Sequence, residues 1–238
     1  MPRSLPPICI LAGGLGTRLG HHVRDTPKPL LEVAGEPFLL HQLRLLATHG
    51  ADRVVLCVGY LGERIVEAIG DHRFGISIAY SHDGPELIGT LGAVRNAAAL
   101  LGDRFLVLYG DTYLRIDYRA VAAAWEESRL PSLMTVLHNQ GRWERSNVEF
   151  DGRRVITYDK YAPTRAMEWI DYGLGGLERM ILDEAGSECA DLADLYHVLA
   201  ARSQLFGYAA TERFYEIGTP EALAETSAFL SGADAPQT

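Results

Sequence analysis

A glycine-rich segment early in the chain carries the residue types that bind phosphate. Residues Leu11–Gly20 read LAGGLGTRLG and follow a short apolar run, Ile8–Ala12. Glycines directly after a buried strand let the backbone turn and approach a ligand, with several amide N–H groups free to bind anionic oxygen. A dinucleotide-binding loop would need a third glycine at Leu19, and a P-loop would need a lysine, but no lysine precedes Lys28. The segment alone therefore predicts either an anion-binding loop of another kind or a plain strand-to-helix turn.

Two cations lie in or just after this segment. Arg18 is within it, and Lys28 follows in the sequence TPKPL. Prolines on both sides restrict the backbone and predict an extended stretch around Lys28. A preorganised cation beside an anion-binding loop suits a phosphoryl group under attack. Arg18 would bind the terminal phosphates as a planar fork, and Lys28 would meet the α-phosphate as a point charge.

Lysine is scarce in this chain, which has 20 arginines but only two lysines, Lys28 and Lys160. Codon bias toward arginine would explain the scarcity. Under such a bias, the lysines that remain mark positions where the wide guanidinium fork does not replace a compact ammonium. The composition therefore marks both lysines as candidates for a functional role, beside the plain explanation by codon bias.

The overall composition is that of an ordinary globular enzyme. The chain has 238 residues, 47% of them apolar, and a formal net charge of 22 − 31 = −9. The acidic balance argues against a nucleic-acid partner, and no apolar run approaches the ~20 residues that span a bilayer. Ile8–Ala12 is too short for a signal-peptide core, the three cysteines are sparse, and the eight histidines show no metal-binding spacing. We expect a cytoplasmic protein.

Short apolar runs alternate with helical patterns through the first half of the chain. The predicted strands are Ile8–Ala12, Arg53–Val58, Ile76–Tyr80, Phe105–Tyr109 and Leu133–Leu137. The predicted helices are Pro37–Thr48, Gly62–Ile69, Leu91–Leu101 and Tyr118–Arg129. This alternation predicts an α/β fold, a Rossmann-like, mixed but mostly parallel sheet flanked by helices.

The second half predicts hairpins added to that sheet and a C-terminal lobe over the active site. Strands are expected at Asn147–Phe150, Val155–Tyr158, Trp169–Leu174 and Leu205–Ala210, and helices at Leu192–Ala201 and Pro220–Leu230. No linker or repeat interrupts the chain. We expect one domain over residues 1–238, with a folded core over about 8–230 and a frayed tail over 232–238.

Several motifs together resemble a known family. LAGGxGTRL, then PKPL, then a GEPF segment that leads into a helix, is similar to the sugar-1-phosphate nucleotidyltransferases. The D-glycero-D-manno-heptose 1-phosphate guanylyltransferase group is the most similar group, and the N-acetylmuramate-1-phosphate uridylyltransferases are a little less similar. The resemblance runs from about Ile8 to Leu230 and implies the nucleotidyltransferase fold. It identifies the family more specifically than it identifies the base or the sugar.

The resemblance assigns the glycine loop and the GTLGA segment at Gly89–Ala93 to the nucleotide. From the residues alone, Thr90 could equally be an ordinary helix N-cap. The nucleotide-binding residues that the resemblance implies are Leu11, Ala12, Gly13, Gly14, Gly16, Thr17, Arg18, Lys28, Gly89 and Thr90.

An aspartate after the predicted strand Phe105–Tyr109 is the expected metal ligand. Gly110-Asp111 stands at a strand's carboxyl end, where open sheets bind ligands, although Asp is also a common turn former. In the family this aspartate binds Mg²⁺, which suits hard oxygen ligands and phosphates. The late FYEIGTP element resembles another family motif, with Glu216 where an aspartate that completes the metal site is usual. The resemblance thus implies Arg18, Lys28 and Asp111 as catalytic residues and Asp111 and Glu216 as metal ligands.

Three further positions are implied for the sugar phosphate. They are Gly92, Lys160 of a YDK element, and Asp171 of WIDYG, where asparagine is usual. An ionised Asp171 would accept hydrogen bonds only. We expect Arg18, Lys28, Asp111 and Lys160 to gather around one polyanion pocket.

The expected activity is nucleotidyl transfer from an NTP, GTP in the first instance, to a sugar 1-phosphate, with D-glycero-D-manno-heptose 1-phosphate as the first acceptor to consider. The products would be a nucleotide-diphospho-sugar and pyrophosphate, and Mg²⁺ would be the cofactor. Two alternatives stay open: a uridylyltransferase acting on another sugar 1-phosphate, and a catalytically silent nucleotide-binding regulatory module. A homo-oligomer is compatible with the sequence.

Overall fold

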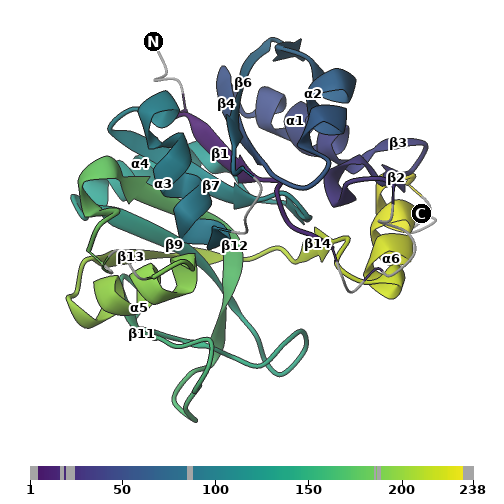
Figure 1. The fold of residues 1–238 in the computed structure, drawn as a ribbon. Helices are drawn as coiled ribbons and strands as arrows, with labels where there is room; N and C mark the ends of the chain where they lie inside the picture. Colours follow the sequence, from purple (N-terminus) through teal and green to yellow (C-terminus); the bar gives the residue numbers. More distant parts are fainter. Residues whose placement is uncertain are drawn as a thin grey trace.

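A mixed β-sheet forms the centre of the molecule (Figure 1). The structure, a computed structural model, describes residues 5–16, 19, 25–84, 88–184, 186 and 189–232. The strand order is β11-β10-β12-β7-β1-β4-β6-β5, and β9 joins β12 to β13. The strands are β1 (Ile8–Leu11), β4 (Arg53–Val58), β5 (His72–Arg73), β6 (Ile76–His82), β7 (Arg104–Tyr109), β9 (Ser132–His138), β10 (Val148–Phe150), β11 (Val155–Tyr158), β12 (Trp169–Glu178) and β13 (Leu205–Ala210).

The first half supplies the parallel part of this sheet. β1 lies between β7 and β4, β6 follows β4, and all of these neighbours run parallel. β12 pairs with β7 in the antiparallel direction and begins the part that the second half adds. The carboxyl ends of β1, β4, β6 and β7 therefore meet at one edge, as the alternating sequence pattern predicts.

Helices cover both faces because side chains alternate along each buried strand. Ile8 and Ile10 pack in one core and Cys9, between them, packs in the other. The first core holds side chains of α1 (Phe38–Thr48), α2 (Gly62–Ile69) and α4 (Tyr118–Ser128). The second holds side chains of α3 (Gly89–Leu101) and α5 (Leu192–Ala201). Within the described ranges, no helix has the length and apolar composition that crossing a bilayer requires.

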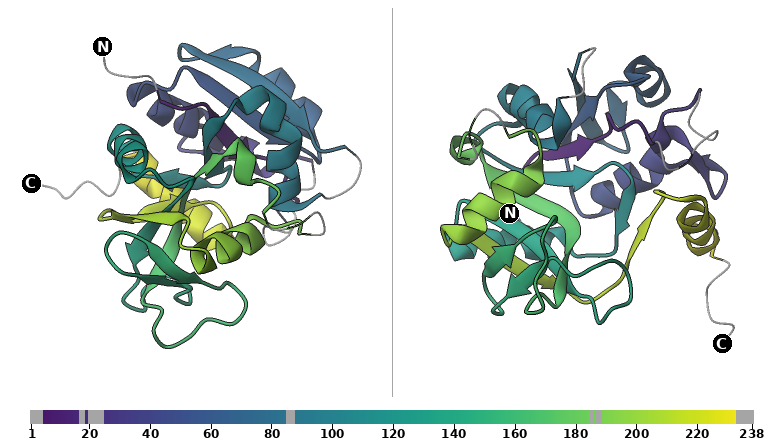
Figure 2. Two further views of the ribbon diagram at one scale, coloured as in Figure 1. Left: turned by 90° about the vertical axis from the view of Figure 1, so that its left-hand side faces the viewer. Right: turned by 60° about the horizontal axis from the view of Figure 1, so that its bottom comes forward.

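The end of the described chain returns to the N-terminal half. β14 (Phe214–Glu216) pairs with β8 (Thr112–Leu114), and α6 (Pro220–Leu230) contacts β2 (Glu32–Val33), which pairs with β3 (Glu36–Pro37). Figure 2 shows β14 and α6, in yellow, apart from the other second-half elements. The Ala34 amide donates to the Ser227 hydroxyl at 3.1 Å across this contact. The expected tail begins at Gly232, and 233–238 lie outside the described residues.

Two local predictions are wrong. Lys28 does not lie in an extended stretch but begins a 3₁₀ turn, Lys28–Leu30, because the Leu30 amide bonds the Pro27 carbonyl at 2.8 Å and Pro29 needs no amide partner there. β12 does not end at Leu174. It continues through Gly175 and Gly176, where Tyr196 and Trp125 pack against the backbone and leave no room for side chains.

Candidate active site

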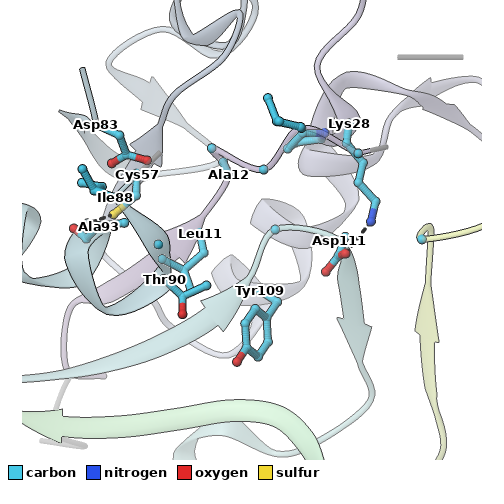
Figure 3. Close-up of a pocket in the computed structure, with 18 of the residues that line it drawn as sticks. Leu11, Ala12, Lys28, Cys57, Asp83, Ile88, Thr90, Ala93, Tyr109 and Asp111 are labelled. Atoms are coloured by element: carbon cyan, nitrogen blue, oxygen red, sulfur yellow. Dashed lines mark hydrogen bonds and ion pairs between the residues drawn. The ribbon is translucent and has the colours of Figure 1, made fainter. Parts of the chain in front are cut away.

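A cavity of about 490 Å³ opens at the carboxyl ends of the parallel strands (Figure 3). Its lining comes from the ends of β1, β4 and β7, from the loops after β1, β6, β7 and β14, from the 3₁₀ turn at Lys28, from the start of α3 and from the residue before α5. Of the residues predicted to bind nucleotide, those that line it are Leu11, Ala12, Gly13, Gly14, Gly16, Lys28, Gly89 and Thr90. Thr17 and Arg18 lie outside the described residues. Asp111 also lines the cavity.

The glycine loop is pressed against its neighbours in the sheet. The Ala12 amide donates to the Cys57 carbonyl at 2.9 Å, which extends the pairing of β1 with β4 by one residue. A Cβ on Gly13 would lie 2.6 Å from Oδ2 of Asp83 and 3.1 Å from the Gly59 amide nitrogen. Gly16 has a φ of 63°, a left-handed conformation that favours glycine. The loop can therefore pass close to both the sheet and a ligand only with glycine at these positions.

Lys28 and Asp111 form an ion pair at one end of the cavity. Lys28 Nζ donates to Oδ2 of Asp111 at 2.5 Å. The Lys28 side chain is 10% exposed, whereas that of Asp111 is 31% exposed. An ammonium carries three donors, so this bond leaves two for a ligand oxygen. The pair places one fixed cation and one accessible carboxylate beside the glycine loop.

The turn that carries Asp111 is held by a buried glutamine of α1. Gln42 Nε2 donates to the Tyr109 carbonyl at 2.9 Å and to the Thr112 carbonyl at 2.7 Å. Gly110 fits beneath the end of β1, where a Cβ would lie 2.6 Å from the Leu11 carbonyl oxygen. The position of the Asp111 carboxylate is thus set from both sides of the turn.

Glu216 lies on the strand that pairs beside this turn. In the β8–β14 pairing Glu216 is opposite Thr112, and the Ile217 amide donates to the Asp111 carbonyl at 3.0 Å. Gly218 lines the cavity, whereas the Glu216 side chain does not. Among the residues with described positions, no three His, Cys, Asp or Glu side chains cluster closely enough to hold a metal by themselves. A metal here would take its other ligands from substrate oxygens.

The start of α3 is joined to the start of α5. The Ala190 carbonyl accepts hydrogen bonds from the amides of Leu91 at 2.7 Å and Gly92 at 3.3 Å. Thr90 is not the N-cap of α3, which is Ile88, a residue without a capping side-chain bond. Instead the Thr90 hydroxyl accepts from the Leu192 amide at 2.8 Å, in the first turn of α5, since α3 meets α5 here.

The opposite end of the cavity is mostly apolar and holds one carboxylate. Figure 3 shows Cys57, Ile88 and Ala93 around Asp83, across the cavity from the Lys28–Asp111 pair. Oδ1 of Asp83 is shielded from water and has no hydrogen-bond partner among the described residues. Burial raises the pKa of Asp83 above its ordinary value. Asp83 lines the cavity, so its carboxylate offers a hydrogen-bond acceptor to a donor group of a ligand at this end.

The residues expected at the sugar phosphate do not line this cavity. Asp171 Oδ1 accepts from the Gly173 amide at 2.9 Å, and burial raises the pKa of Asp171 to about 6 while the Lys160 charge opposes that rise. Lys160 is exposed in the connection between β11 and β12. Gly92 is part of a neighbouring hollow shared with His82 and Asp83. Neither Lys160 nor Asp171 is among the described residues that line this cavity.

Three polar residues of the site were not among the sequence predictions. They are Gln42, Asp83 and Asp191. Gln42 lies within a predicted helix, and no motif distinguishes it from other polar residues there. Asp83 lies in a loop and belongs to no recognised motif. Asp191 stands just before a helix, where aspartate is an ordinary N-cap. Only Asp83 carried a signal, since it follows a predicted strand at the same edge of the sheet as Asp111.

Comparison with known proteins identifies relatives over nearly the whole chain. A family model described as Nucleotidyl transferase matches residues 8–231. D-glycero-alpha-D-manno-heptose 1-phosphate guanylyltransferase of Campylobacter jejuni is 31% identical over 217 residues, which cover 89% of this chain and 94% of that protein. N-acetylmuramate alpha-1-phosphate uridylyltransferase of Neisseria meningitidis is 40% identical over 113 residues, 47% of this chain and 49% of that protein. The solved structure of UDP-glucose pyrophosphorylase from Acinetobacter baumanii shares the fold, with a TM-score of 0.82, 15% identity, and coverage of 98% of this chain and 95% of that one.

Proposed function

The chain belongs to the nucleotidyl transferase family, and from this premise we propose that it transfers a guanylyl group from GTP to D-glycero-D-manno-heptose 1-phosphate. The activity class, sugar-1-phosphate nucleotidyltransferase, follows from its relatives. The observation that carries the proposal for this chain's own residues is the Lys28–Asp111 pair, 2.5 Å apart beside the glycine loop. It offers a fixed cation and a carboxylate where a triphosphate bound by the loop would lie.

The reaction exchanges one phosphorus–oxygen bond for another. A phosphate oxygen of the sugar 1-phosphate attacks the α-phosphorus of GTP, the bond to the β-phosphate breaks, and pyrophosphate leaves in line with the attack. Lys28 donates to an α-phosphate oxygen and neutralises charge that grows there, while Arg18 binds the leaving phosphates. No covalent enzyme intermediate is required, so the residues act by positioning and by charge stabilisation.

Asp111 and Glu216 would hold Mg²⁺. The donor set fits this ion, since Mg²⁺ in nucleotide sites takes one or two carboxylates and completes its shell with phosphates and water. Asp111 has a partly exposed carboxylate with one oxygen bonded to Lys28, and the β8–β14 pairing brings Glu216 to the neighbouring strand. Bound there, the ion would neutralise phosphate charge and orient the triphosphate.

Asp83 supports guanine as the base. If the phosphates lie at Lys28, a nucleotide that extends along the cavity places its base at the apolar end, beside Asp83. Guanine offers two adjacent donors on one edge, its N1–H and its 2-amino group, and the Asp83 carboxylate would accept from that edge. Uracil offers a single ring N–H. We therefore assign base discrimination to Asp83, and Asp83→Asn should weaken the preference for GTP over UTP by ~10-fold or more.

The test is a panel of the four nucleoside triphosphates against several sugar 1-phosphates, with Mg²⁺ present and pyrophosphate release measured. The proposal expects the highest kcat/KM for GTP with the manno-heptose 1-phosphate. Highest turnover with UTP and another sugar phosphate would replace it with the uridylyltransferase alternative. Background release in every combination, with GTP still binding, would favour the silent regulatory module and point to Glu216 as the altered position.

A further inference from the structure

Asp191 stands at a helix-capping position but does not cap the helix. It directly precedes α5, with φ −100° and ψ 142°, the extended conformation of an N-cap residue. An aspartate there ordinarily accepts a hydrogen bond from the amide of the second or third helical residue. The Asp191 side chain makes no such bond. Instead its Oδ1 accepts a hydrogen bond from the Thr90 hydroxyl at 3.1 Å.

Thr90 takes over part of the capping that Asp191 leaves undone. The Thr90 Oγ1 accepts from the Leu192 amide at 2.8 Å while its proton is given to Asp191. A side-chain cap stabilises a helix start, so this exchange lets α5 begin without a cap from the Asp191 side chain. One carboxylate oxygen of Asp191 is thereby fixed against α3, and Asp191 is one of the residues that line the cavity.

The position of Asp191 points to the acceptor side of the cavity. Figure 3 shows the Thr90 hydroxyl directed away from Asp83. The helix that Asp191 precedes, α5, packs against β11, and the His197 ring bonds the Tyr158 carbonyl at 2.8 Å, two residues before Lys160. Asp191 therefore lies between the nucleotide loop and the segment that carries Lys160.

We propose that Asp191 binds hydroxyl groups of the acceptor sugar, an inference that rests on the proposed function. An ionised carboxylate only accepts hydrogen bonds, so its partner must be a donor, and a sugar ring presents several hydroxyls. The negative charge also disfavours a phosphate at this place. It would therefore favour an orientation in which the sugar 1-phosphate turns its hydroxyls toward Asp191 and its phosphate toward the cations.

The experiment compares Asp191→Asn with Asp194→Asn. Asparagine keeps the oxygen that accepts from Thr90, so the α3–α5 junction stays bonded, and only the charge and the second acceptor oxygen are lost. Asp194 gives a matched control because it lies in the first turn of the helix that Asp191 precedes and does not line the cavity. Initial rates are measured with GTP and D-glycero-D-manno-heptose 1-phosphate, each varied at saturating levels of the other, and thermal unfolding is recorded for each variant.

The expected result is a rise of ~10-fold or more in the KM for the sugar phosphate in Asp191→Asn, with the KM for GTP within about twofold of wild type. Asp194→Asn should match wild type in both. An unchanged sugar-phosphate KM would overturn the inference, and so would an equal rise in both constants, which would indicate a ribose contact or a merely structural role. A wild-type protein without turnover on the whole panel would refute the proposed function itself, and this inference with it.

Discussion

Replacement of Lys28 by methionine tests the central assignment most directly. Methionine keeps most of the side-chain volume and removes only the charge and the donors. Because Lys28 is 10% exposed and bonded to Asp111 at 2.5 Å, its ammonium is held in place before substrate arrives. Two of its three donors are free for phosphate oxygens. Removal of one preorganised donor from developing charge costs about 3–4 kcal/mol, so kcat should fall by ~10²–10³.

The variant should remain folded. Asp111 loses its partner, but its side chain is 31% exposed and water can solvate it, so we expect a stability loss of only about 1 kcal/mol. The assay is pyrophosphate release at saturating GTP and sugar phosphate, together with circular dichroism and urea unfolding. Arg179→Met serves as the control, since it makes a similar change at an exposed cation outside the cavity. A folded Lys28→Met protein with kcat within about threefold of wild type would show that this cation does not act on the α-phosphate.

Three other predictions follow from the site. Lys160→Ala should raise the KM for the sugar phosphate with little change in the KM for GTP, and an unchanged sugar-phosphate KM in initial-rate measurements would contradict the assignment. Gln42→Met should lower kcat by ~10-fold, because the turn that carries Asp111 loses its two hydrogen bonds from Gln42. A folded variant with normal kcat and normal Mg²⁺ dependence would contradict this positioning role. Asp171 has its pKa raised to about 6 on folding, so the folded state loses stability relative to the unfolded state as pH rises from about 4 to 6. Asp171→Asn should therefore stabilise the protein by about 2 kcal/mol at pH 8 and by much less at pH 3.5, as measured by urea unfolding at both pH values.

The sequence predicted the sheet and one end of the cavity because both depend on local patterns. Apolar runs of strand length marked β1, β4 and β7, and the carboxyl ends of such strands must meet at one edge. Lys28 and Asp111, 83 positions apart, could therefore be placed together. The same reasoning could not place Lys160, which is not among the described residues that line the cavity. Lys160 follows the β10–β11 hairpin, and the spacing of residues along the sequence does not tell how far that hairpin lies from β1.

Other parts of the site depend on contacts between distant segments. Asp191 stands where an aspartate ordinarily caps a helix, and only the packing of α3 against α5 shows that Thr90 bonds the first amide of α5 instead. Gln42 looked like one polar residue on a helix, and its function became visible only with the Asp111 turn beside it. Hydrogen bonds between segments far apart in the chain produce no recognisable pattern in the sequence. They appear once the tertiary fold is known.

The junction at Ala190, whose carbonyl takes two amides of the α3 first turn, has a consequence for how this enzyme family could be recombined. A chimera that joins the second half of a relative to this N-terminal half takes the loop before α5 from the relative. Gly89 has a φ of 73°, and a Cβ there would meet the Ala190 carbonyl oxygen at 2.4 Å. The chimera will therefore fold correctly only if the loop before α5 places a backbone carbonyl beside Gly89, as Ala190 does here. Chimeras that exchange the acceptor specificity should therefore take this loop and the residue at position 89 from the same parent.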